Sequence, residues 1–223
     1  MDRKVKTGAW LLVLAAAVPV GVQAQGKVEA SVGADLVSGY IWRGQDLGNV
    51  SIQPSASISY RGFSLSGWGS VGFEKEDTKE FDLTFGYAHK GFSVSVTDYW
   101  FNSGPGYFHY GSTNTSHVFE VQVGYDFGLL ALNWYTNFAG NDGVNKDGDR
   151  AYSSYLSVVA PFKLGGLDWT AGIGATPWAN TFYNGGASGF EVCDISVGVS
   201  KEIGITDSFS LPLFPKFTWN PAT

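Results

Sequence analysis

Side chains alternate between apolar and polar along most of the chain, and this period of two constrains the fold more than any other feature. Between Phe119 and Phe127, aromatic residues and valines occupy every second position, with polar residues and glycine between them. A period of two places the two sets on opposite faces of an extended strand. The alternation predicts strands near residues 27–43, 50–60, 63–74, 79–89, 92–102, 115–127, 129–139, 150–163, 166–178, 189–203 and 208–219.

The connections between the predicted strands alternate in length. Short glycine turns, such as Arg61-Gly62 and Lys90-Gly91, follow every second strand, and the other connections are polar and generally longer. Short turns at one end and longer loops at the other are typical of up-and-down outer-membrane barrels. The longer loops are predicted at 44–49, 75–78, 103–114, 140–149 and 179–188.

Alternation alone fits two all-β folds, a soluble sandwich with an apolar core and a membrane barrel with an apolar outer face. Most predicted strands have eleven or more residues, whereas sandwich strands average about five or six and a membrane-spanning strand needs about nine to eleven. We therefore predict an up-and-down antiparallel transmembrane β-barrel. Aromatic residues near the strand ends would form its two interfacial girdles, namely Tyr40, Trp42, Phe63, Phe92, Trp100 and Phe127.

The N-terminus resembles an export signal. Basic residues come first, an apolar stretch runs from Ala9 to about Val20, and small residues precede Gln25. This order predicts a cleaved secretory signal peptide over residues 1–24 and a barrel domain over 25–223. The alternative is an N-terminal membrane anchor, for which the apolar run is short. The predicted location is the bacterial outer membrane.

The composition argues against several functional classes. The formal net charge is −6 and charged residues make up 15% of the chain, which disfavours a nucleic-acid partner. Cys193 is the single cysteine, and the three histidines, His89, His109 and His117, are not spaced as a metal-binding pair. His109 and Ser112 lack a residue that would orient them for nucleophilic catalysis. We expect no enzyme activity, no cofactor and no metal.

The polar strand faces would line the barrel lumen. An acid-rich lumen would favour cations through its electrostatic field. The alternative is a filled interior in which these groups pair with one another. The lumen-lining residues predicted in this way are Glu29, Asp35, Arg43, Glu80, Asp82, Glu120, Asp126 and Asp168.

Residues 30–72 carry a family resemblance. The signature is Ser-x-Tyr-x-x-Arg-Gly, then a proline-containing strand and a Gly-Phe turn into a Gly-Trp strand. Its members are Ser38, Tyr40, Arg43, Gly44, Pro54, Gly62, Phe63 and Trp68. This stretch resembles the TorF-type porin family, also called the Gcw_chp family of bacterial outer-membrane proteins. The resemblance implies a Gram-negative barrel that acts as a porin, with no catalytic residues.

We predict a porin-like channel for passive passage of small solutes, with a preference for cations, whose partners are these solutes and outer-membrane lipid. The sequence is compatible with a homo-oligomer and with a monomer. One alternative is a structural or adhesive barrel that binds a partner through loops 103–114 and 179–188. Another is a secreted soluble β-sandwich that binds a ligand. Eleven strands would leave the first and last parallel to each other, so we also predict that they do not pair and that the barrel needs a twelfth, C-terminal closing strand that this sequence lacks.

Overall fold

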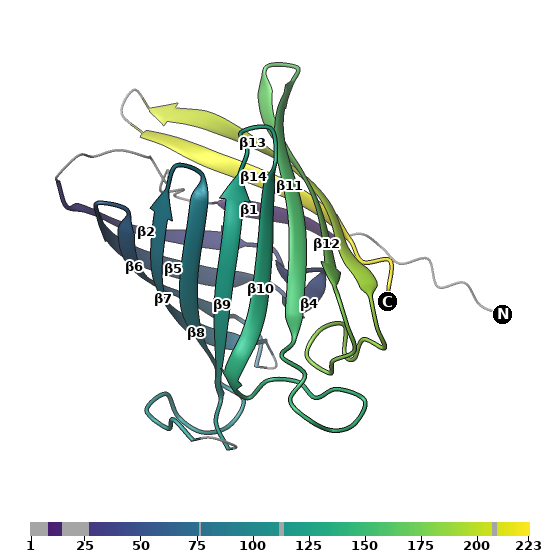
Figure 1. The fold of residues 1–223 in the computed structure, drawn as a ribbon. Coiled ribbons are helices and arrows are strands. Elements are labelled where there is room, and N and C mark those ends of the chain that lie inside the picture. Colours follow the sequence, from purple (N-terminus) through teal and green to yellow (C-terminus); the bar gives the residue numbers. More distant parts are fainter. Residues whose placement is uncertain (1–8, 15–26, 76, 112–113, 207–208) are drawn as a thin grey trace.

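The computed structural model describes residues 9–14, 27–75, 77–111, 114–206 and 209–223, and every regular element in them is a β-strand (Figure 1). No helix of membrane-spanning length and apolarity occurs in this described part of the chain. The first eight residues and residues 15–24 of the predicted signal peptide lie outside the described residues.

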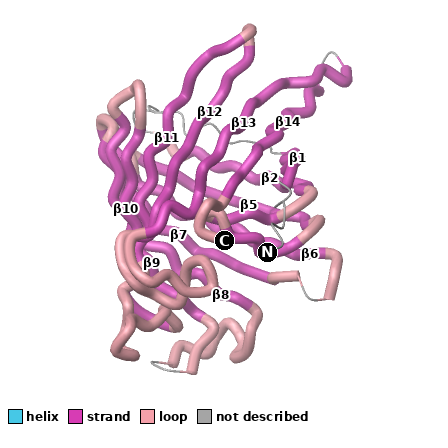
Figure 2. Tube along the Cα trace, turned by 90° about the vertical axis from the view of Figure 1, so that its right-hand side faces the viewer, coloured by secondary structure: helices cyan, strands magenta, loops and turns pink. Residues whose placement is uncertain are grey.

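Eleven strands form one continuous antiparallel sheet in which each strand pairs with its neighbours in the sequence. The number of strands agrees with the eleven that the alternation predicts. The sandwich alternative requires two packed sheets, whereas the structure has a single curved sheet (Figures 1 and 2). The strands are β2 (Glu29–Val37), β5 (Ser51–Tyr60), β6 (Phe63–Gly72), β7 (Lys79–His89), β8 (Phe92–Phe101), β9 (His117–Asp126), β10 (Ala131–Gly140), β11 (Ser154–Leu164), β12 (Leu167–Thr176), β13 (Glu191–Thr206) and β14 (Phe209–Trp219).

The two edge strands of this sheet, β2 and β14, do not pair with each other, as predicted. The eleven strands by themselves therefore leave the sheet open. A short strand from the N-terminal apolar stretch, β1 (Ala9–Leu14), lies between the two edges and pairs antiparallel with both. Its Val13 is opposite Phe214 of β14 on one side and Val37 of β2 on the other.

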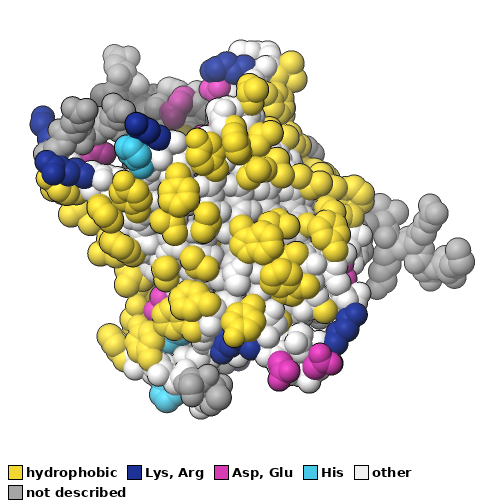
Figure 3. Space-filling view, viewed as in Figure 1, with side chains coloured by type: hydrophobic (Ala, Val, Ile, Leu, Met, Phe, Trp, Pro, Cys, Tyr) yellow, Lys and Arg dark blue, Asp and Glu magenta, His cyan; other side chains and the backbone are white. Residues whose placement is uncertain are grey.

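The two faces of the sheet differ sharply in polarity. The outer face carries a band of exposed apolar side chains, while Lys, Arg, Asp and Glu gather near the strand ends (Figure 3). Val32 and Phe85 are 83% and 56% exposed on this face. The inner face holds buried polar residues such as Glu120 and Asn137. This distribution is the reverse of a soluble protein with an apolar core.

The first predicted strand ends earlier than expected, and this moves three predicted residues. The main-sheet strand stops at Val37, and the following residues form a separate hairpin of β3 (Tyr40–Trp42) and β4 (Gln45–Gly48). Its two-residue turn is Arg43-Gly44, with φ of 51° and 79°. Positive φ at both central residues is the geometry that closes tight hairpins.

The outward, girdle position predicted for Tyr40 and Trp42 is therefore wrong. The bend at Ser38-Gly39 directs the hairpin inward, so Tyr40 is buried against Glu80 and Trp42 packs against Tyr99. Arg43 faces the interior as predicted, but from the hairpin turn and not from the end of a spanning strand.

Candidate functional site

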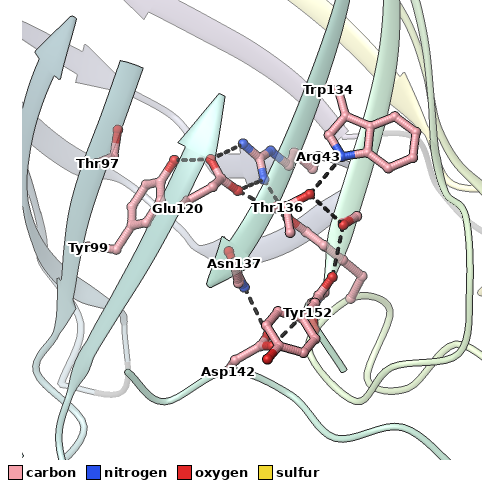
Figure 4. A network of polar contacts seen from close by, with 12 residues as sticks. Arg43, Thr97, Tyr99, Glu120, Trp134, Thr136, Asn137, Asp142 and Tyr152 are labelled. Atoms are coloured by element: carbon pink, nitrogen blue, oxygen red, sulfur yellow. Dashed lines mark hydrogen bonds and ion pairs between the residues drawn. The ribbon is translucent and has the colours of Figure 1, made fainter. Parts of the chain in front are cut away.

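Arg43 is the centre of a polar cluster inside the curved sheet (Figure 4). Its Nη1 donates to Glu120 Oε2 at 2.5 Å and its Nη2 donates to Glu120 Oε1 at 2.8 Å. The two side chains are 8% and 2% exposed. A guanidinium that meets both oxygens of one carboxylate forms the strongest and most directional type of protein ion pair.

Four aromatic rings surround the same guanidinium. The distances from Arg43 Cζ to the ring centres are 4.0 Å for Tyr135, 4.4 Å for Trp42, 5.0 Å for Tyr155 and 5.8 Å for Tyr183. All lie within the range over which ring faces attract cations. We call these four rings together with Glu120 the arginine cage.

Two tyrosine hydroxyls complete the hydrogen bonding of the cage. Tyr99 donates to Glu120 Oε1 at 2.9 Å, and Arg43 Nη1 donates to the Tyr183 hydroxyl. Tyr183 also lies within 3.5 Å of Glu120 Oε2. Since the carboxylate receives donors on both oxygens, the buried negative charge is compensated inside the site.

Tyr183 reaches the interior because the loop 177–190 folds inward. Asn180 Oδ1 accepts the backbone N–H groups of Phe182 and Tyr183, at 3.0 and 2.7 Å, which fixes the tip of this loop. The next residue, Asn184, donates its N–H to Gln45 Oε1 of β4 at 3.1 Å. The hairpin and this loop thus fill the loop half of the interior together, and we call the two segments the plug.

The base of the hairpin is fixed by Asp77. Its carboxylate accepts the backbone N–H groups of Asn49, at 3.1 Å, and Glu74, at 2.9 Å. These two donors hold the pKa of Asp77 below its ordinary value, because they stabilise the ionised form.

Further acidic side chains lie on the inner face beside the cage. Tyr40 donates to Glu80 Oε2 at 2.8 Å, and Tyr155 donates to Asp194 Oδ2 at 3.1 Å. Asp82 Oδ1 and Asp194 Oδ1 are buried without a hydrogen-bond partner among the described residues. Arg43 is the only cation that an ion pair places among these acids in the described part of the chain, so carboxyl groups outnumber their paired cation in the loop half of the interior.

The structure divides the predicted lumen residues into two groups. Arg43, Glu80, Asp82 and Glu120 come together in the loop half of the interior, as described above. The others lie elsewhere on the inward parity. Glu29, Asp126 and Asp168 are exposed near the short turns, Asp168 pairs with Lys163 at 2.7 Å, and Asp35 lies along β2.

Four of the predicted girdle residues keep their expected outward position. Phe63, Phe92 and Phe127 are exposed at the short-turn ends, and Trp100 lies at the loop end of β8. Their contact with a membrane interface stays a prediction. Residues that the sequence reasoning missed are those that complete the cage and its surroundings: Tyr99, Tyr135, Tyr155, Tyr183 and Asp194.

One polar pair interrupts the apolar outer face. His117 Nδ1 lies 2.7 Å from Asp98 Oδ1, and its Nε2 lies 2.6 Å from the Tyr107 carbonyl oxygen. The Tyr110 ring stacks on the imidazole with centres 4.1 Å apart. Residues 103–111 therefore fold back over the outside of β8 and β9 and shield the pair.

No family model, curated protein or solved structure matches the chain. Within the described residues, no group of three or more His, Cys, Asp or Glu side chains is arranged to hold a metal ion. The fold defines an all-β protein built on one antiparallel sheet. The polarity of its two faces and the arginine cage are the features that bear on its function.

Proposed function

We propose that the chain forms a β-barrel in the bacterial outer membrane that passes small solutes, prefers cations and is restricted by the plug. The observation that carries the proposal is the reversed polarity, with exposed apolar residues outside and buried carboxylates inside. Exposed apolar patches of more than a few hundred Å² are rare on soluble monomers. A lipid environment would remove this face from water.

Closure of the barrel would need a strand between β2 and β14. In lipid, each unpaired backbone N–H or C=O costs several kcal/mol, so an open sheet edge is not tolerated there. The antiparallel pairing of β1 with both edges supports a place for one strand between them. We propose that a twelfth strand occupies this place in the membrane, which agrees with the even strand numbers of bacterial barrels.

Cation preference follows from the charges of the inner face. Glu80, Asp82, Glu120 and Asp194 lie in the loop half of the interior with Arg43 among them. Those of the carboxyl groups that are ionised would raise the local concentration of cations and repel anions.

The plug would keep the conductance of the resting barrel small. Arg43 and Tyr183 fill the loop half of the interior from two different segments, and both are buried. On the short-turn side the inner wall is less filled, with a hollow of about 490 Å³ lined by residues such as Lys163, Thr170 and Lys216. Solutes would enter this side freely, and passage to the loop side would require the plug to move.

Two measurements test the proposal. A folded membrane barrel in detergent should migrate differently on a gel before and after boiling, whereas a soluble protein should stay in solution without detergent. In planar bilayers under a KCl gradient, the protein should give small steps whose reversal potential shows cation preference. Anion preference, or no conductance even after the plug is deleted, would contradict the channel.

A second candidate is an adhesive barrel that binds a partner through its outer loops. Phe108 is 90% exposed in loop 103–114, whose fold is fixed by the contact between Tyr107 and His117. A rigidly held, exposed aromatic is typical of protein-binding surfaces. Phe108→Ser should abolish adhesion and leave conductance unchanged if this candidate is correct.

A further inference from the structure

The arginine cage has the composition of a ligand-binding site, and its occupant belongs to the chain itself. Arg43 enters it from a hairpin turn, and Glu120 and three of the four rings belong to other segments. We propose that the cage is a binding site for guanidinium cations, which Arg43 occupies as a tethered ligand. The inference rests on the proposed channel, since it names a class of solute for that interior.

The geometry selects a guanidinium over other cations. The two Glu120 oxygens receive two parallel N–H groups at 2.5 and 2.8 Å, and the Tyr183 hydroxyl accepts a further N–H. The ring of Tyr135 lies closest to the flat cation, at 4.0 Å. An ammonium group cannot present two parallel donors to one carboxylate. A compact metal cation would need more oxygen ligands than Glu120 supplies.

The burial of the cage adds to the selectivity. Glu120 and Tyr183 are fully buried, and the Arg43 side chain is almost so. A guanidinium is more weakly hydrated than an ammonium and loses less when it leaves water. The ring faces then stabilise the desolvated cation.

The hairpin that carries Arg43 lies outside the backbone ladders of the main sheet. β3 and β4 pair with each other and not with any strand of the main sheet. Among the contacts that hold the turn are the Arg43–Glu120 ion pair and the hydrogen bond from Asn220 Nδ2 to the Gly44 carbonyl oxygen at 3.1 Å. Withdrawal of the hairpin would break no main-sheet ladder, and it would leave Glu120 and the rings of Tyr135, Tyr155 and Tyr183 in place for a solute.

The test removes the tethered ligand and supplies it from solution. Arg43→Ala keeps the Cβ atom, and ethylguanidinium then matches the missing atoms of the arginine side chain. We expect saturable binding of ethylguanidinium to the full-length variant in detergent, followed by tryptophan fluorescence and by a rise in thermal unfolding temperature. Ethylammonium should bind about 10-fold more weakly or worse, because it lacks the paired donors. Neutral ethylurea should give no effect.

Two matched variants separate the cage from general salt effects. Wild-type protein, with its cage filled, should not respond to ethylguanidinium in the same range. The double variant Arg43→Ala/Glu120→Gln should lose the response. Equal responses to ethylguanidinium and ethylammonium, or an unchanged response in the double variant, would overturn the proposal.

The refolding yield of Arg43→Ala is also measured with each additive. This yield gives a result even if the variant folds only when its ligand is bound. A higher refolding yield with ethylguanidinium than with ethylurea supports the proposal. Equal yields, together with the absence of binding, overturn it. Binding without any bilayer current would refute the channel and leave the guanidinium site intact. Current without binding would do the opposite.

Discussion

Replacement of Glu120 with glutamine should destabilise the protein strongly although the two side chains have nearly the same shape. Glu120 is 2% exposed, and its oxygens accept both Arg43 Nη groups and the Tyr99 hydroxyl. Glutamine would present an NH₂ group to one of the Arg43 donors, so a buried cation would lose its counter-charge. Breaking a buried ion pair in this way costs about 3–5 kcal/mol.

Two further variants divide this cost into its parts. Tyr99→Phe removes one hydrogen bond to the carboxylate and should cost about 1.5–3 kcal/mol. Arg43→Met/Glu120→Leu removes both charges together and should cost less than Glu120→Gln alone, because no unpaired charge stays in the interior. The rings of Trp42 and Tyr135 would then pack against an apolar side chain.

The assay is urea unfolding of the protein in lipid vesicles, followed by tryptophan fluorescence and extrapolated linearly to zero denaturant. Reversibility is checked by refolding from high urea. A Glu120→Gln variant within about 1 kcal/mol of wild type would refute the reasoning, since it would mean that water reaches the pair. So would a double variant that is less stable than Glu120→Gln.

Other predictions concern the plug and the outer face. Gly44→Ala should displace the hairpin, because a Cβ atom there would collide with the Cys193 carbonyl group. Gly148 has a similar positive φ with open space around it, so the control variant Gly148→Ala should cost only about 1–3 kcal/mol of backbone strain. Urea unfolding compares the stabilities of the two variants. Phe85→Arg at the middle of β7 should cost about 2–4 kcal/mol in vesicles, and Phe127→Arg at a strand end about 0–1, whereas a soluble protein would tolerate both. The ionised Asp77, whose pKa is lowered, stabilises the hairpin base at pH values above the ordinary carboxyl pKa, and this contribution is lost as pH falls through the lowered value. Limited proteolysis should therefore show that acid opens the hairpin base of the wild-type protein. Asp77→Asn at neutral pH should be cleaved as readily as the wild-type protein in acid.

The strand pattern could be predicted from the sequence because it depends on local alternation. Ten of the observed main-sheet strands begin and end within four residues of the predicted ranges, as β7 does at Lys79–His89. The inward parity of Glu80, Asp82 and Glu120 follows from the same period of two. Neither feature needs information about which strands become neighbours.

The inward hairpin could not be predicted from alternation, since Tyr40 and Trp42 continue the apolar parity of the strand before them. A local signal was nevertheless present. Arg43-Gly44 is the same dipeptide as Arg61-Gly62, and both adopt positive φ at the two positions, as does Lys90-Gly91. The basic residue and glycine that were assigned to short turns elsewhere also make a turn here.

The arginine cage lies beyond any local pattern, because its members are brought together by the curvature of the whole sheet. Arg43 and Tyr183 are 140 positions apart in the sequence, and Arg43 and Glu120 are 77 apart. Tyr135 and Tyr155 read as ordinary strand residues, and only their inward parity distinguishes them from the outer aromatics. Arg43 was the one arginine among the predicted lumen residues and the one clue, since a buried guanidinium needs a carboxylate partner and flat apolar surroundings. The fourth ring, Tyr183, reaches Arg43 only because loop 177–190 folds inward, and this fold is seen only in the three-dimensional structure.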